Sequence, residues 1–152
     1  MILKPGDKAP AFTAKDQNGN TVSLKDFKGR KVVLYFYPKD DTPTCTVQAC
    51  NLRDNFAQLK AKDITVIGIS VDDEKKHKKF ETKYNLPFTL VADPERKIVE
   101  AYGVWGEKQF MGRTIIGTHR VSFLIDEKGK IAHIIDKVKS KIHTEQILAF
   151  WG

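Results

Sequence analysis

The chain has 152 residues, of which 41% are hydrophobic and 30% charged, and 26 lysines and arginines against 19 aspartates and glutamates give a net charge of +7. This length and composition are typical of a globular protein, and we expect residues 1–152 to form one domain. The basic residues are spread over the chain and no apolar run reaches the roughly 18 residues of a membrane span, which disfavours nucleic-acid binding and membrane insertion. Two cysteines and no hydrophobic signal segment favour a cytoplasmic protein with free thiols.

Short apolar runs alternate along the chain with segments of helical periodicity. The Asn-Gly pair in the loop 17–20 is typical of a tight hairpin turn, so the two runs beside it should pair. The lysine-rich segment 73–85 places His77, Phe80 and Tyr84 on one helical face and its lysines toward solvent. In chain order, we expect strands at 12–15, 21–24 and 31–37, a helix at 45–60, a strand at 64–70, a helix at 73–85, a strand at 87–93, a helix at 96–103, strands at 119–126 and 130–136, and a helix at 143–151.

The order of these elements predicts the fold class. Apolar strands separated by helices indicate a sheet that is buried on both faces, with right-handed crossovers between its parallel strands. The strands 119–126 and 130–136 flank the EKGK loop and should form a closing hairpin, which makes the sheet mixed. We therefore expect an α/β protein with three layers, in which a central mixed sheet is flanked by helices and preceded by an N-terminal β-hairpin.

Both cysteines lie in one stretch, YFYPKDDTPTCTVQAC, where a strand gives way to a helix. On a regular helix Cys45 faces the core and shares its stripe with the apolar residues Ala49, Leu52 and Phe56. Cys50 then points about 140° away, with a Cα–Cα separation of about 8.7 Å. This separation exceeds the limit of roughly 7 Å for a disulfide, so the two thiols cannot bond while the helix is intact.

The position of Cys45 in the first turn of that helix has two interpretations. The unpaired N–H groups and the dipole of a helix N-terminus stabilise a thiolate, and Thr42 lies close enough in sequence to hydrogen-bond the sulfur or a substrate oxygen. Alternatively, the loop only builds a turn and caps a helix, and Cys45 is a small core residue. We expect Asp40 and Asp41 to be solvated turn residues. The local pattern alone leaves both interpretations of Cys45 open.

The segment PKDDTPTC matches the PxxxTxxC signature of peroxiredoxins, with Pro38, Thr42 and Cys45 at the defining positions. The wider string YFYPKDDTPTCTVQAC, which includes Cys50, resembles the bacterioferritin comigratory protein or peroxiredoxin Q subfamily. The resemblance extends over nearly the whole chain, through LKPGDKAPAF, VIGISVDD, KYNLPFTLVAD and HRVSFLIDEKGKI. It implies a thioredoxin-like fold and a thiol-dependent peroxidase that reduces hydrogen peroxide and organic hydroperoxides and is recycled by thioredoxin.

The resemblance also implies roles for five residues. Cys45 would be the peroxidatic nucleophile that becomes a sulfenic acid, and Cys50 would be the resolving cysteine of an atypical 2-Cys enzyme with an intramolecular disulfide. Thr42 would orient the peroxide, and Pro38 would shield the thiolate from water. Arg120 would stabilise the thiolate and polarise the O–O bond, and an arginine in so apolar a strand needs a partner. Without the motif, a strand-end arginine that reaches solvent is the alternative.

These implied roles require a conformational change. Because Cys50 cannot reach Cys45 in the folded helix, the disulfide needs local unwinding of the first helical turns. Helix ends fray, and opening part of a protein costs less free energy than unfolding all of it. We therefore expect a folded, peroxide-reactive state and a locally unfolded, disulfide-bonded state.

Two positions depart from the subfamily pattern, because Thr44 stands where glycine is usual and Gln48 where glutamate is usual. We expect Thr44 to narrow access to the pocket, and Gln48 to keep hydrogen bonding while removing a negative charge, which favours the thiolate slightly. The four histidines make no metal-ligand spacing with the two cysteines, so we expect no metal and no cofactor. We also expect a monomer, because no exposed apolar strand or heptad pattern is recognised.

Two alternatives from other functional classes are open on the residues alone. A disulfide reductase or metallochaperone is disfavoured, because the cysteines lack the CxxC spacing of a ready disulfide. A basic, non-catalytic binding module would leave the placement of Pro38, Thr42 and Cys45 unexplained.

Overall fold

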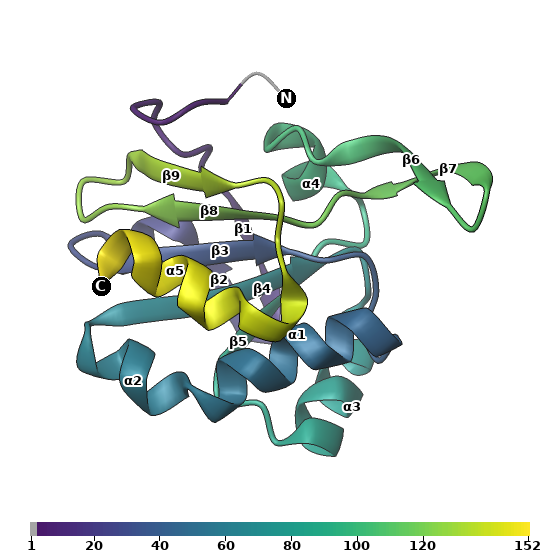
Figure 1. The fold of residues 1–152 in the computed structure, drawn as a ribbon, viewed down its shortest axis with the longest axis horizontal. Coiled ribbons are helices and arrows are strands. Elements are labelled where there is room, and N and C mark those ends of the chain that lie inside the picture. Colours follow the sequence, from purple (N-terminus) through teal and green to yellow (C-terminus); the bar gives the residue numbers. More distant parts are fainter. Residues whose placement is uncertain (1–2) are drawn as a thin grey trace.

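The computed structural model describes residues 3–152, and Figure 1 shows a twisted central sheet, helices packed against it and a hairpin that projects to one side. Among the described residues, no helix is long and apolar enough to cross a membrane. The strands are β1 (Thr13–Asp16), β2 (Thr21–Ser23), β3 (Lys31–Phe36), β4 (Ile64–Ser70), β5 (Thr89–Ala92), β6 (Trp105–Phe110), β7 (Arg113–Thr118), β8 (Val121–Ile125) and β9 (Ile131–Ile135). The helices are α1 (Pro43–Asp54), α2 (Phe56–Ala61), α3 (Glu74–Tyr84), α4 (Lys97–Ala101) and α5 (His143–Trp151), with 3-10 turns η1 (Leu24–Phe27) and η2 (Ser140–Ile142).

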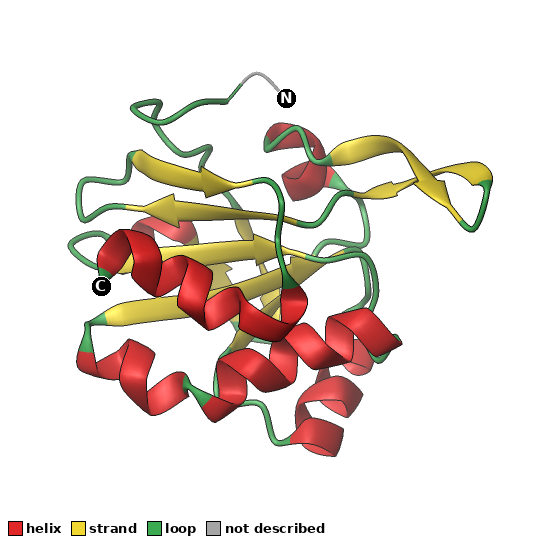
Figure 2. Cartoon of the chain, viewed as in Figure 1, coloured by secondary structure: helices red, strands yellow, loops and turns green. Residues whose placement is uncertain are grey.

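Seven strands form one mixed sheet in the order β2–β1–β5–β4–β3–β8–β9 (Figure 2). The strands β3, β4 and β5 run parallel, whereas β8 is antiparallel to both β3 and β9, and β1 is antiparallel to both β2 and β5. Parallel neighbours need a crossover, which α1 and α2 supply between β3 and β4, and α3 between β4 and β5. The predicted α/β class, the mixed sheet and the N-terminal hairpin are confirmed.

The two faces of the sheet carry separate apolar clusters, which explains why β3 is apolar at nearly every position. Alternate residues Val32, Leu34 and Phe36 join one cluster with residues of α4 and of the N-terminal segment. Tyr35 faces the other way and joins a second cluster with residues of α1, α2, α3 and α5, and Cys45 belongs to this second cluster. The sheet is thus the middle of three layers, and the cysteine lies between the sheet and the larger helical layer.

The expected helix 45–60 is in fact two helices, α1 and α2. The break is at Asn55, whose backbone adopts φ −110° and ψ 13°. Its side-chain amide donates to the carbonyl of Asn51 at 2.8 Å, which is a local bond that competes with the regular helical pattern. The break lies ten residues after Cys45 and leaves the helix around both cysteines uninterrupted.

The hairpin of β6 and β7 is a second, two-stranded sheet that is not among the elements expected from the sequence. Phe110 pairs with Arg113, so the loop consists of Met111 and Gly112, with φ of 50° and 76°. Two positive φ angles in a two-residue loop are the backbone of a type I′ turn, whose first position asparagine or aspartate usually occupies. Methionine occupies that position here, so the sequence lacks the Asn-Gly or Asp-Gly pair that predicts a hairpin.

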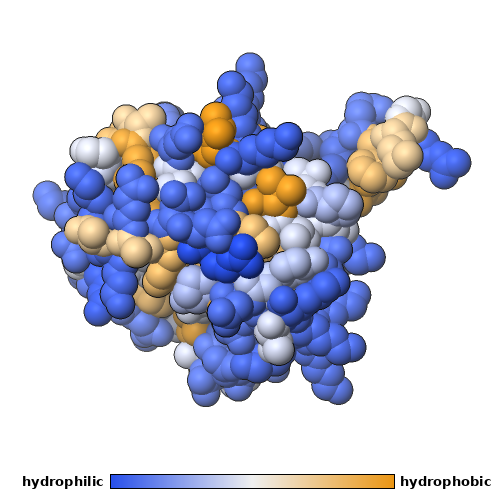
Figure 3. Space-filling view, turned by 60° about the horizontal axis from the view of Figure 1, so that its bottom comes forward, coloured by the Kyte–Doolittle hydropathy of each residue, from blue (hydrophilic) through white to orange (hydrophobic). Residues whose placement is uncertain are grey.

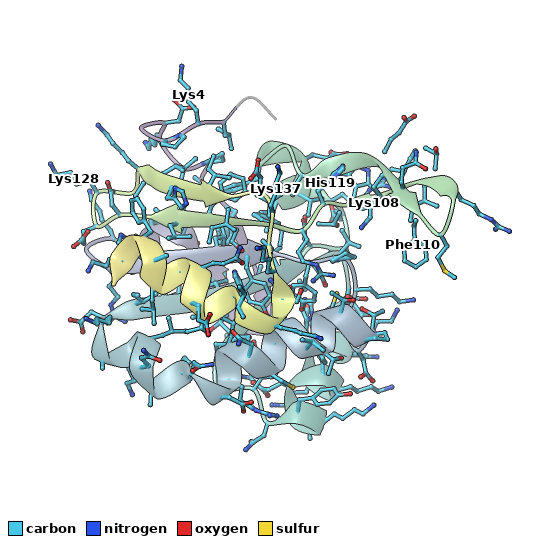
Figure 4. All side chains as sticks on the ribbon, in the orientation of Figure 1. Lys4, Lys108, Phe110, His119, Lys128 and Lys137 are labelled. Atoms are coloured by element: carbon cyan, nitrogen blue, oxygen red, sulfur yellow. The ribbon has the colours of Figure 1, made fainter. Side chains whose placement is uncertain are left out.

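Apolar side chains are exposed on this hairpin, which carries apolar surface in Figure 3. Phe110 is 56% exposed, Met111 86% and Ile116 66%. Figure 4 shows Phe110 toward the tip of the hairpin, and Lys108 and His119 closer to its base. The premise that no apolar strand is exposed is therefore wrong, although the monomer expected from it stays a prediction.

Candidate active site

Cys45 occupies the third position of α1, which begins at Pro43 directly after the loop that leaves β3. Thr42 precedes the helix with an extended backbone, and a proline at the first helical position loses no hydrogen bond while fixing the φ that the helix needs. Cys45 is only 2% exposed. It lies in the first helical turn, whose free N–H groups favour negative charge.

The loop that precedes the cysteine is anchored by Asp40, which is buried. Its carboxylate accepts from the Tyr37 hydroxyl at 2.6 Å and lies 2.6 Å from His77 Nδ1, and its backbone N–H donates to Asp72 at 2.8 Å. The other ring nitrogen of His77 lies 2.9 Å from the Val91 carbonyl. The expectation that Asp40 is a solvated turn residue is wrong, because protein groups replace water as its hydrogen-bond partners.

The neighbouring Asp41 is exposed, as expected of a turn residue, and ties the same loop to α3. Its carboxylate accepts from Lys83 at 2.8 Å and from the Tyr84 hydroxyl at 2.7 Å. These bonds hold the pKa of the Asp41 carboxyl below its ordinary value. An exposed ion pair stabilises a fold only slightly, so Asp40 is the main anchor of the loop.

Arg120 precedes β8 and reaches the cysteine from the neighbouring strand. In the pairing of β3 with β8, Phe36 lies opposite Val121, which places Arg120 beside the loop that leaves β3. Arg120 Nη2 lies 3.3 Å from Cys45 Sγ, and Nη1 donates to Gln48 Oε1 at 2.6 Å. The guanidinium is therefore held between the sulfur and a buried amide.

Thr42 and Pro38 frame the same loop. The Thr42 hydroxyl donates to the carbonyl of Lys39 at 2.9 Å, so its proton is committed and its oxygen is left as an acceptor. No hydrogen bond joins Thr42 to Cys45 in the described structure. Pro38 is half-buried at the start of the loop.

A pocket of about 340 Å³ opens to solvent beside Arg120. Thr44 lies at this pocket, as expected, and its effect on access stays a prediction. A larger cavity of about 920 Å³ is lined by Lys31 and Ile64, the first residues of β3 and β4. Cys45 lies beyond the other end of β3, so this cavity plays no part in the site. The smaller pocket is lined by Pro43, Thr44, Val47, Arg120, Val138, Ser140 and Lys141.

Cys50 is half-buried, and both cysteines are free thiols. The helix α1 runs without a break from Pro43 to Asp54, so regular geometry applies to both cysteines. Their Cα atoms are then about 8.7 Å apart and their side chains diverge by about 140°. The structure brings Arg120 to Cys45 but does not bring Cys50 within bonding reach.

One group of side chains among residues 3–152 is spaced for a metal ion: ligand atoms of Asp40, Asp72 and His77 lie within 4.8 Å of one another. These atoms are already engaged in the protein. His77 Nδ1 faces Asp40, and Asp72 Oδ2 accepts from the Ser70 hydroxyl at 2.7 Å. The group fits a hydrogen-bonded anchor of the loop better than a metal centre, and the absence of a metal or cofactor stays an expectation.

Two buried polar residues next to the site, Ser122 and His143, were not predicted as part of it. Gln48 Nε2 lies 3.2 Å from His143 Nδ1, and His143 Nε2 lies 2.9 Å from Ser122 Oγ. Burial, followed by the charge of Arg120, lowers the pKa of His143 to about 3. His143 is therefore neutral at physiological pH. Nothing in the sequence links positions 48, 122 and 143, because their contact exists only once α5 packs on α1.

The chemistry open to such a site is nucleophilic attack by a thiolate. A helix N-terminus and a guanidinium both favour negative charge on the sulfur, and the pocket of about 340 Å³ opens beside the guanidinium. Placed at the end of a central strand of the α/β sheet, this arrangement is the one that the PxxxTxxC resemblance implies for a thiol-dependent peroxidase.

Comparison with known proteins gives the same class. The model of the AhpC/TSA family matches residues 5–134. The chain is 51% identical over 146 residues to Peroxiredoxin Bcp of Escherichia coli K12, covering 96% of this chain and 94% of that protein. It is 45% identical over 148 residues to Peroxiredoxin Bcp of Bacillus subtilis, covering 97% and 94%. The chain therefore belongs to the AhpC/TSA family, as a peroxiredoxin of the Bcp type.

Solved structures support the same assignment. The bacterioferritin comigratory protein of Xanthomonas campestris superposes with a TM-score of 0.88 at 28% identity, covering 97% of each chain. The peroxidoxin BcpB of Mycobacterium tuberculosis superposes with a TM-score of 0.86 at 28% identity, covering 98% of this chain and 96% of that chain. The predicted family and thioredoxin-like fold are confirmed, and the protein is a thiol peroxidase rather than a disulfide reductase or a basic binding module.

Proposed function

We propose that Cys45 is the peroxidatic cysteine and that Arg120 activates both its thiolate and the peroxide. The observation that supports this most directly is the 3.3 Å distance from Arg120 Nη2 to the buried Cys45 Sγ. A preorganised cation at this distance stabilises charge on the sulfur and on the oxygen atoms of the breaking bond. The thiolate attacks the terminal peroxide oxygen, which keeps its hydrogen, and an S–O bond forms as the O–O bond breaks. The sulfur loses two electrons, and the departing hydroxide or alkoxide takes up the proton that the Cys45 thiol released on ionising, so that water or an alcohol leaves.

Thr42 orients the peroxide in this proposal, and Pro38 shields the thiolate from water. Because the Thr42 hydroxyl gives its proton to the Lys39 carbonyl, its oxygen is free to accept a hydrogen bond from the peroxide O–H. That single acceptor selects a substrate that presents a proton on the oxygen under attack.

Cys50 is the proposed resolving cysteine. Its thiolate attacks the sulfenic sulfur of Cys45, an S–S bond forms as the S–O bond breaks, and the departing hydroxide takes up the proton that the Cys50 thiol released, to give water. Both cysteines lie on one continuous helix, so the first turns of α1 must unwind for the bond to form. A dithiol reductant then returns two electrons to the disulfide, and we propose thioredoxin in that role.

The proposed substrates are hydrogen peroxide and alkyl hydroperoxides. The pocket beside Arg120 combines the apolar side chains Val47 and Val138 with the polar Ser140. A small alkyl group has apolar surface to contact there while its peroxide group faces the arginine. The Xanthomonas campestris relative is described as reducing alkyl peroxides.

We further propose that residues 1–152 act as one domain and that the protein is a cytoplasmic monomer. The seven-stranded sheet, which joins the N-terminal strands β1 and β2 to β8 and β9 near the other end of the chain, supports a single domain. The exposed apolar tip of the β6–β7 hairpin is the surface through which two copies of the chain could associate, which would contradict the monomer proposal. Light scattering over a range of concentrations checks it, and a dimer that persists on dilution would contradict it.

Counting free thiols tests the proposed reaction. When one equivalent of hydrogen peroxide is added to the reduced protein, both thiols should disappear within seconds, because attack at Cys45 is followed by capture by Cys50. Thioredoxin should then restore both. Thiols that survive an excess of peroxide would refute the proposal, as would loss of both thiols with no Cys45–Cys50 bond found by peptide mapping.

A further inference from the structure

Four buried or half-buried side chains form a chain of hydrogen bonds that ends at the reactive sulfur, and donor–acceptor chemistry allows only one direction for it. The Arg120 guanidinium only donates, so the Gln48 atom that faces it at 2.6 Å is the carbonyl oxygen. The Gln48 NH₂ group must then face His143 Nδ1, which has to accept. The ring proton therefore lies on Nε2, which donates to Ser122 Oγ at 2.9 Å.

We propose that His143 is a positioning residue for the peroxidase reaction: as a neutral acceptor at Nδ1, it fixes the amide of Gln48 and thereby holds the Arg120 guanidinium against Cys45. This inference rests on the proposed roles of Cys45 and Arg120. It adds a residue from the far end of the chain, the first of α5, to the machinery that aligns the peroxide.

The surroundings of His143 suit this role. Gln48, Ser122 and His143 are each 0% exposed, so water cannot replace a lost partner. The ring of Tyr35 packs edge-on against the imidazole, with centroids 5.7 Å apart, which fixes its plane. Burial and the charge of Arg120 lower the pKa of His143, which keeps Nδ1 free to accept.

This arrangement depends on a glutamine, rather than a glutamate, at position 48. A glutamate there would present only acceptor oxygens to Arg120 and to His143. His143 Nδ1 would then have to take up a proton, and a buried carboxylate would compete with the thiolate for the guanidinium. With Gln48, the guanidinium keeps its full charge for the sulfur, and the neutral histidine determines where the amide points.

Two substitutions of His143 separate positioning from mere packing. In His143→Asn, the side-chain oxygen lies close to the position of Nδ1 and still accepts from Gln48, whereas His143→Leu fills the space without an acceptor. We expect His143→Leu to lower the second-order rate constant for hydrogen peroxide about tenfold, the effect of one ordinary buried hydrogen bond. His143→Asn should stay within about threefold of the parent, since that bond is kept.

Two readouts distinguish this from a structural effect. Alkylation of Cys45 by iodoacetamide needs the thiolate but not an aligned O–O bond, so His143→Leu should slow alkylation much less than it slows the peroxide reaction. Thr144→Val is the matched control: Thr144 follows His143, is buried and bonds Asn51 rather than Gln48. It should lower thermal stability while leaving the ratio of the two rates unchanged.

The ring proton gives a direct check. Nitrogen-15 spectra of histidine-labelled protein should show His143 neutral, with its proton on Nε2, at neutral pH. A proton on Nδ1 would overturn the inference. So would a His143→Leu variant in which the ratio of the peroxide rate to the alkylation rate is the same as in the Thr144→Val control. If the parent protein does not react with peroxide at Cys45, the proposed function itself fails, which is a distinguishable outcome.

Discussion

Replacing Cys45 with serine is expected to abolish peroxide turnover. Serine fills nearly the same space at this buried position, so the fold should persist. Its hydroxyl yields no accessible anion at neutral pH, however, and only the thiolate is a nucleophile strong enough to break the O–O bond. Peroxide consumption coupled to thioredoxin should fall to the background rate, and turnover above background would refute the assignment of Cys45.

Replacing Cys50 with serine is the matched control, because it removes the other thiol from the same helix. The first attack on peroxide should remain fast, since Cys50 does not touch the sulfur of Cys45 in the folded state. The intramolecular disulfide can no longer form, so Cys45 should accumulate as sulfenic acid and then over-oxidise. Mass spectrometry after a pulse of peroxide detects these products, and a variant that still forms an intramolecular bond would contradict the scheme.

Replacing Arg120 with alanine is expected to slow the reaction of Cys45 with peroxide by about a hundredfold to a thousandfold, the usual loss when one preorganised charge-stabilising group is removed. The guanidinium lies 3.3 Å from the sulfur, so its loss removes charge stabilisation from both the thiolate and the breaking O–O bond. Stopped-flow measurement of the oxidation rate checks this. A parent-like rate would show that another group activates the peroxide.

Two further arginine variants test whether the effect comes from Arg120 itself or from the net charge of the protein. Arg120→Lys keeps the positive charge but loses the planar fork that contacts the sulfur and Gln48 together, so its rate should lie between those of the parent and the alanine variant. Arg113→Ala makes the same change in net charge at an exposed position on β7 and should react at the parent rate. Equal losses in the Arg113 and Arg120 variants would point to overall charge rather than to local activation.

Most of the fold could be predicted because its signals are local. The continuous apolar run of β3, the amphipathic face of α3 and the Asn-Gly turn between β1 and β2 each report on neighbouring residues. The β6–β7 hairpin could not be predicted because Met111 occupies a left-handed position that asparagine usually takes. The break at Asn55 could not be predicted because its cause is a side-chain hydrogen bond to the Asn51 carbonyl, which competes with the regular backbone hydrogen bonds of the helix.

The site was only partly predictable, because its groups come from distant segments. The motif placed Pro38, Thr42 and Cys45 in one segment, the loop after β3 and the first turn of α1, and strand alternation with the family resemblance pointed to Arg120. The burial of Asp40 and the contact of His143 with Gln48 depend on how α3 and α5 pack against that loop and against α1. Such long-range contacts leave no periodic pattern in the sequence.

The proposed resolving step would have to break several contacts of the folded site. To reach Cys50, the sulfur of Cys45 has to leave Arg120, and Gln48 has to leave Arg120 and His143. One turn further on, the side chain of Asn51 still binds the backbone N–H of Thr144 at 2.9 Å, which ties the helix to α5. Unwinding should therefore be confined to the beginning of α1.

Amide hydrogen exchange on the reduced and the oxidised protein tests this central claim most directly. When the Cys45–Cys50 bond has been verified by peptide mapping, exchange should speed up within residues 42–53, most strongly in the turns before Asn51, and helix content should fall by one to two turns, on the order of 5 residues. Protection elsewhere, in β3, β4 and β8, should be unchanged. Unaltered protection across that segment in the disulfide-bonded protein would contradict the unwinding mechanism.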